Sequence, residues 1–155
     1  MARLLSLRQR MGWLALGPAF LVFSATLPAH AAGSDAKNYQ SVSREEARVV
    51  AAIGAKDAKS LKRSVATLGG IIGAAMKRKQ AGGEVTSCEM AAHSLGFAAL
   101  SAAEALAQSG EARKVLIGDA TTAAADYQSD MQACEKSNGR KTGSHTGVGK
   151  ALRAL

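Results

Sequence analysis

Residues 86–137 read TSCEMAAHSLGFAALSAAEALAQSGEARKVLIGDATTAAADYQSDMQACEKS and hold both cysteines of the chain. The stretch is rich in alanine, the residue with the highest helix propensity, and it lacks proline. Before the Ser109-Gly110 turn, small and apolar residues recur at spacings of four and three: Cys88, Ala92, Leu95, Ala99, Ala102 and Leu106. After the turn, similar spacings join Leu116, Ala120, Ala123, Tyr127, Met131 and Cys134. The pattern predicts two helices joined by a short connection at residues 108–110.

The two cysteines lie at similar distances from this connection. Cys88 precedes the turn by about 21 residues and Cys134 follows it by about 24, so the arms measure roughly 32 and 36 Å at 1.5 Å per helical residue. An antiparallel hairpin would therefore bring the two thiols together at its open end. We predict a Cys88–Cys134 disulfide that stabilises the fold by about 2–4 kcal/mol. A redox role is the alternative, but the chain has no CxxC motif.

Two further helical segments are expected before the hairpin. Residues 43–46, Ser-Arg-Glu-Glu, form a capping-box pattern that predicts a helix start at Ser43. Between residues 54 and 60 the pattern is ambiguous: either this helix ends and Ser60 caps a second one, or a single long helix continues. The next apolar stripe contains Leu61, Val65, Leu68, Ile72 and Met76. Gly69 and Gly73 would allow close approach of a neighbouring helix, and Gly82-Gly83 is expected to end the segment.

The first 31 residues have the layout of a secretory signal peptide. A basic start carries Arg3, Arg8 and Arg10, an uncharged apolar run follows, and Ala29-His30-Ala31 supplies small residues for cleavage. The apolar run is shorter than about twenty residues and breaks at Pro28, which makes an uncleaved membrane anchor the weaker alternative. We expect an exported protein, periplasmic or secreted, without a stable membrane anchor after cleavage.

The chain is therefore divided into a signal peptide (1–31), a polar lead (32–42), a helical bundle domain (43–137) and a basic, flexible tail (138–155). The tail is assigned from its content of glycine and basic residues. The predicted fold is all-α: a small antiparallel bundle of three or four helices, with a disulfide-stapled C-terminal hairpin, after a cleaved signal peptide.

Charge is unevenly distributed along the chain. The net charge of +8 comes from 20 basic and 12 acidic residues, and loss of the three signal arginines leaves about +5. Residues 36–79 are mainly basic and residues 80–135 mainly acidic, which predicts two layers that face each other within one fold. Binding of a polyanion is the alternative, but nucleic acid is not an expected partner outside the cytoplasm.

Candidate binding residues lie on a second face of the first hairpin helix. Met90, His93, Phe97 and Leu100 point away from the predicted seam between the hairpin helices. This face either packs on the two preceding helices or binds a ligand or partner. A more specific version is a metal or haem site that uses His93 with Met90 or Met131, because methionine and histidine suit copper(I) or axial haem ligation.

Catalytic patterns are weak in this sequence. Asp126 and Asp130 form an i, i+4 carboxylate pair that ordinarily marks a solvated helix face, and GxSxG, HExxH and P-loop motifs are missing. We expect no enzyme activity and no cofactor. The leading hypothesis is a non-catalytic periplasmic protein that binds another envelope or secreted protein. The alternatives are the metal- or haem-binding bundle and a structural component of the envelope.

Overall fold

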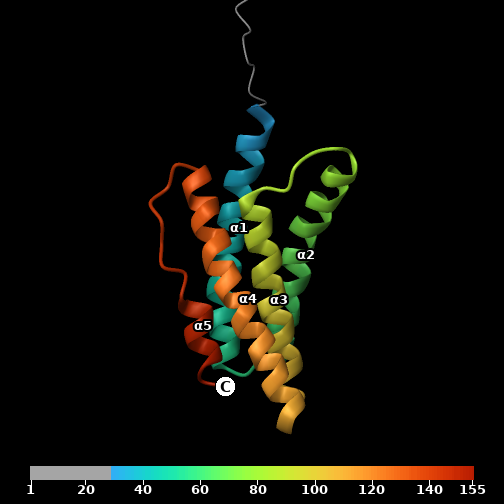
Figure 1. Ribbon diagram of the computed structural model, residues 1–155, viewed down its shortest axis with the longest axis vertical. Coiled ribbons are helices and arrows are strands. Elements are labelled where there is room, and N and C mark those ends of the chain that lie inside the picture. The colour runs from blue at the N-terminus through green and yellow to red at the C-terminus, as the bar shows by residue number, and fades with distance from the viewer. Residues whose placement is uncertain (1–28) are drawn as a thin grey trace, which may run out of the picture.

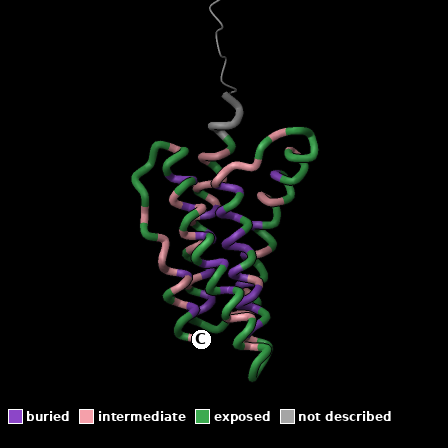
Figure 2. Tube along the Cα trace, viewed as in Figure 1, coloured by how far each residue is buried: buried purple, intermediate pink, exposed green. Residues whose placement is uncertain are grey.

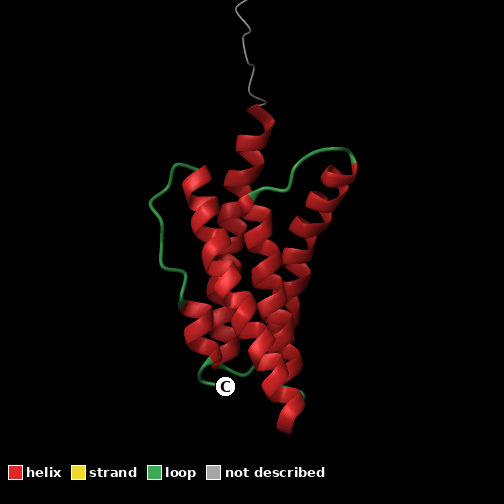
Figure 3. Cartoon of the chain, viewed as in Figure 1, coloured by secondary structure: helices red, strands yellow, loops and turns green. Residues whose placement is uncertain are grey.

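The computed structural model describes residues 29–155, with side chains from residue 34 onward. Within these residues every regular element is a helix, which confirms the all-α fold class (Figures 1 and 3). The helices are α1 (Ala29–Gly54), α2 (Ala58–Gln80), α3 (Ser87–Ala105), α4 (Gly110–Ser137) and α5 (Gly147–Leu152). The predicted signal peptide lies outside the described residues, apart from residues 29–31, which begin α1. None of the described helices combines the length and the apolar character that crossing a membrane requires.

The four long helices lie side by side, and short α5 packs at one end of the bundle (Figure 1). Helix α3 is central: its most extensive contacts are with α4, followed by α2, and it also contacts α1. Burial follows this arrangement, because most residues of α3 are buried while the outer helices expose one side (Figure 2).

The α3–α4 hairpin matches the sequence prediction closely. Thr86 caps α3, and its capping box with Glu89 is complete in both directions. Alanines from α3 and α4 fill the seam between the two helices, including Ala99 and Ala123. Because alanine side chains are small, the two helices pack closely but bury modest apolar area per residue.

The disulfide is present at the open end of this hairpin. Cys88 and Cys134 are bonded with their Cα atoms 4.6 Å apart, and both are completely buried. The Asn138 side-chain amide donates to the Cys134 carbonyl at 2.9 Å and lies 3.3 Å from Sγ of Cys88. The bond therefore sits beneath the C-cap of α4, as the arm lengths predicted.

Helix α1 corrects two predictions, the polar lead at 32–42 and the helix start at Ser43. The helix runs through this segment, with Tyr39 half-buried and Val42 completely buried. Tyr39, Val42 and Val49 follow one another at spacings of three and seven residues, which keeps them on one face of a helix. The apolar stripe that continues to Val49 therefore already starts at Tyr39. Burial of this stripe against the bundle outweighs the local capping pattern at Ser43.

The ambiguous segment between residues 54 and 60 separates two helices. Lys56 adopts a left-handed backbone conformation with φ of 52°, which ends the first helix. The second helix is capped by Asp57, whose side chain accepts from the Ser60 backbone N–H at 3.0 Å. The predicted cap at Ser60 is therefore wrong by one helical turn, because the carboxylate three residues earlier accepts that bond.

The close approach between α2 and α3 lies at a different glycine from the two that were predicted. Gly69 and Gly73 are exposed, and a Cβ atom at either position would meet nothing within 4 Å. On α3, a Cβ at buried Gly96 would contact side chains of Leu68 and Ile72 at 3.8 Å. Helix α2 thus presents large residues to a small residue on α3, the reverse of the predicted arrangement.

The charge pattern only partly joins the two halves of the bundle. Arg78 at the end of α2 forms an ion pair with buried Glu89 of α3. Among the side chains from residue 34 onward, this is the one Lys or Arg ion pair between the basic stretch 36–79 and the acidic stretch 80–135. Facing charged layers are therefore not the main organising feature of the fold.

The C-terminal segment corrects the prediction of a flexible tail at residues 138–155. Residues 139–146, here called the strap, run along the bundle to α5, whose Val148 and Leu152 are essentially fully buried. Helix α5 contacts α1 and α4, and Arg113 of α4 donates to the Leu155 carbonyl at 3.0 Å. Two apolar residues four positions apart are enough to dock a helix that composition alone assigns to a tail.

Candidate functional site

The predicted binding face lies on the outside of the bundle. Met90 and Phe97 are 43% and 49% exposed, His93 is also exposed, and Leu100 is half-buried. We call these four residues the α3 face. The more ordinary expectation was that this face packs on the two preceding helices, but they do not cover it. Large apolar side chains left half-exposed on an otherwise buried helix are a feature of interaction surfaces.

The residues suggested for a metal or haem site do not converge. Met131 is completely buried in the core, whereas Met90 and His93 are exposed on the opposite side of α3 from the seam. Within the described part of the chain, no group of three or more His, Cys, Asp or Glu residues is placed to hold a metal ion. The structure thus does not assemble the set His93, Met90 and Met131.

The carboxylate pair on α4 is also divided between different surroundings. Asp130 accepts from the buried Ser94 hydroxyl at 2.6 Å, which links α4 to α3, while Asp126 is exposed. One carboxylate therefore has a structural partner and the other faces solvent.

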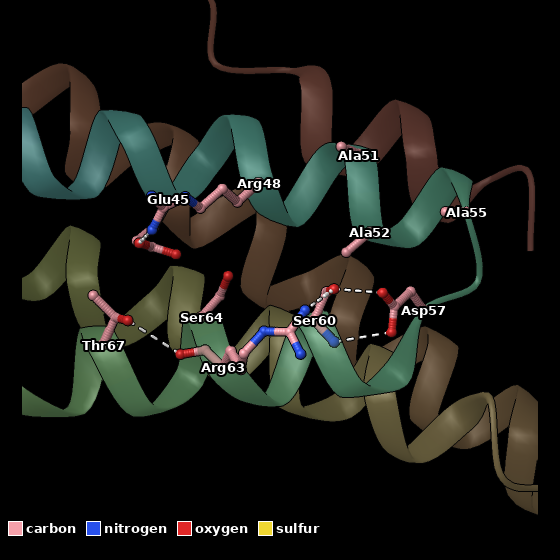
Figure 4. A pocket seen from close by; sticks show the side chains of 10 residues that line it. All are labelled: Glu45, Arg48, Ala51, Ala52, Ala55, Asp57, Ser60, Arg63, Ser64 and Thr67. Atoms are coloured by element: carbon pink, nitrogen blue, oxygen red, sulfur yellow. Dashed lines mark hydrogen bonds and ion pairs between the residues drawn. The ribbon is translucent and has the colours of Figure 1, made fainter.

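A groove of about 530 Å³ lies between α1 and α2 (Figure 4). Its small lining residues are Ala51 and Ala52 from α1, Ala55 from the turn after it, and Ser60, Ser64 and Thr67 from α2. Its charged lining residues are Glu45, Arg48, Asp57 and Arg63. We call this hollow the α1–α2 groove; its size falls within the range of small-molecule sites.

Glu45 stands out among these lining residues, because it is a buried carboxylate. Its side chain is directed into the space between the two helices, opposite Ser64 (Figure 4). Oε1 accepts from Arg48 at 2.6 Å, but Oε2 is buried and has no hydrogen-bond partner. Burying a charged oxygen without a partner is unfavourable, so Oε2 requires a donor that the described side chains do not supply.

A second polar cluster fastens the strap. His145, on the strap, lies with Nδ1 3.0 Å from Oε2 of Glu46 on α1 and Nε2 3.0 Å from Oε1 of Glu135 on α4. The angle at Nε2 is unfavourable for a hydrogen bond, so this second contact is an ion pair. The Gly143 backbone N–H donates to Oε2 of Glu135 at 2.6 Å, and Arg140 stacks on Tyr39 at 4.2 Å.

Electrostatics in this cluster favour a protonated histidine. Burial alone would lower the pKa of His145, but the contacts with Glu46 and Glu135 outweigh it, and the pKa is raised. The Tyr127 and His145 rings pack edge to face, with their centroids 6.1 Å apart. Burial, assisted by the charge of Glu46, raises the pKa of the Tyr127 hydroxyl well above its usual range, so it remains neutral.

The raised pKa of His145 predicts that the strap stabilises the fold most at lower pH. A group whose pKa is higher in the folded state contributes its full stability below the unfolded value near 6.5, and loses it as pH rises through the folded value. The unfolding free energy of wild type minus that of His145→Gln should therefore be largest near pH 6 and decrease towards pH 9. Urea titrations of both proteins across this range measure it, and a difference that stays constant with pH would contradict the prediction.

Neither the α1–α2 groove nor the His145 cluster was anticipated from the sequence. One signal was available for the groove: Glu45 falls between Val42 and Val49 at helical spacing, so an acid occupies the buried stripe of α1. Glu135 gave a similar signal, because it lies four positions after buried Met131 and eight after buried Tyr127, on the same helical stripe.

Comparison with known proteins adds no relative to this description. The chain matches no protein-family model, no curated protein sequence and no solved structure. Its function has therefore to be argued from its own residues.

Proposed function

We propose that this protein is an exported, non-catalytic interaction protein of the cell envelope, which binds another envelope or secreted protein through the α3 face. The signal-peptide layout of residues 1–31 supports export, and so does the buried Cys88–Cys134 disulfide, since such bonds persist in oxidising compartments.

The observation that carries the proposal is the exposure of Met90 and Phe97 on the central helix. Helix α3 is buried on three sides by α1, α2 and α4, yet its fourth side keeps these two large apolar residues exposed. Aromatic residues and methionine are enriched in protein interfaces, and a row of them at helical spacing suits a partner helix or an apolar ridge.

Site-specific photo-crosslinking tests this face directly. A benzoylphenylalanine placed at position 97 in the native host should crosslink to one defined partner in the envelope, whereas the same group at exposed Thr122 of α4 should not. A second variant, Met90→Lys with the crosslinker at 97, should reduce the crosslinked product at least about tenfold.

Each variant is expected to unfold at the same temperature as wild type, because only exposed positions are changed. Equal crosslinking from positions 97 and 122, or crosslinking at 97 that survives Met90→Lys, would exclude the α3 face as the binding surface. A crosslink to the partner from position 122, with none from position 97, would point to a different surface.

A further inference from the structure

The α1–α2 groove holds a buried carboxylate, and one of its two oxygens has no hydrogen-bond donor. Glu45 is 2% exposed, and its one side-chain partner is the Arg48 guanidinium, which is largely exposed. Glu45 lines the groove, and its Oε2 is buried there without a donor. A cationic N–H donor brought by a ligand would complete this carboxylate at little further desolvation cost, because Glu45 is already buried.

The opposite wall of the groove carries a positive charge that no carboxylate pairs with. Arg63 of α2 donates to the neutral Ser60 hydroxyl at 2.6 Å. From residue 34 onward, no acidic side chain lies within ion-pair distance of Arg63. Asp57 is occupied as the cap of α2, where its two carboxylate oxygens accept from Ser60. The Arg63 guanidinium is therefore free to bind a ligand carboxylate in the bidentate geometry that arginine favours.

The rest of the lining fits a small, charge-balanced molecule. Two acidic and two basic side chains line the groove, so its formal charge is balanced, and the Ser64 hydroxyl lies between Glu45 and Arg63 (Figure 4). Ala51 and Ala52 of α1, with Ala55 just beyond its end, form an apolar wall. A fully anionic ligand would meet the buried Glu45 carboxylate, and a fully cationic one would meet Arg63.

We propose that the α1–α2 groove binds a small zwitterion, an amino acid or a short peptide, with its ammonium group on Oε2 of Glu45 and its carboxylate on Arg63. The Ser64 hydroxyl then binds the polar atoms between the two charged ends. This site is separate from the α3 face and does not depend on a protein partner there.

Calorimetric titration of the mature protein tests the proposal. The probes are the standard L-amino acids and the dipeptide Ala-Ala at millimolar concentrations, and at least one should bind saturably at one site. N-acetylation of that probe, which removes the ammonium, and amidation, which removes the carboxylate, should each weaken binding at least about tenfold. Preference for the dipeptide over free amino acids would identify peptide ends as the source of the zwitterion.

Variants locate the binding in the groove. Glu45→Gln and Arg63→Gln should each abolish or reduce binding at least about tenfold, whereas the matched changes Glu84→Gln and Arg44→Gln, at exposed charges outside the groove, should not. Arg63 is exposed, so Arg63→Gln keeps the test valid even if Glu45→Gln lowers stability. The absence of binding by every probe, equal binding of the blocked analogues, or unchanged binding in both groove variants would overturn the proposal.

Discussion

Replacing Cys88 and Cys134 together with alanine is expected to lower the free energy of unfolding by about 2–4 kcal/mol. The disulfide spans 46 positions of the chain, so its loss frees a long loop in the unfolded state. The core beside it is built largely from alanines, which bury little area each, and the bond therefore contributes a large share of the total stability.

Urea unfolding followed by circular dichroism measures this difference, with and without reductant. Reduced wild type and the double alanine variant should unfold at similar urea concentrations, both well below oxidised wild type. A control variant with exposed Thr122 and Ser129 changed to alanine keeps the disulfide and should resemble wild type. A loss of less than about 1 kcal/mol would mean that the bond does not act through the unfolded chain.

Leu152→Ala is expected to destabilise the protein by about 3 kcal/mol, although Leu152 lies in a segment whose composition resembles a flexible tail. The side chain is 1% exposed and belongs to the main hydrophobic core, where α5 contacts α1 and α4. Truncation to alanine removes the buried methyl groups and leaves a cavity that short α5 can only partly close.

The neighbouring Arg153→Ala is the matched control, because this side chain is exposed and its loss should change stability by less than about 0.5 kcal/mol. Both variants are compared by urea unfolding at one pH below 7, where the His145 cluster is intact. Equal stability of Leu152→Ala and wild type would show that α5 is not part of the cooperative core.

The α3–α4 hairpin was predictable because its signals are local and agree with one another. Helical spacing placed Cys88 and Cys134 on inward faces, and similar arm lengths paired them. The start of α3 also follows from a local pattern, because Thr86 and Glu89 lie three positions apart and complete a capping box by hydrogen bonds within four residues. Each of these signals can be read without knowing what packs against the hairpin.

The errors arise where distant residues decide the outcome. Residues 32–42 look polar, yet Val42 is buried by the rest of the bundle, which extends α1 well before Ser43. The strap looks flexible, yet Glu46, 99 positions away, and Glu135, about ten positions away, hold His145 in place. The groove depends on how α1 and α2 sit together, and no pattern within either helix specifies that placement.

The contact between α1 and α5 joins residues near position 50 to residues near position 150, so it has a high sequence separation within a mostly local helical fold. A chain emerging from the ribosome or a translocation channel can form the α3–α4 hairpin from contiguous residues, but Val49 and Ile53 lack their final neighbours until residues 147–152 follow. The part of the apolar side of α1 that α5 covers therefore stays open until residues 147–152 have been made, and the completion of this part of the core is timed by α5.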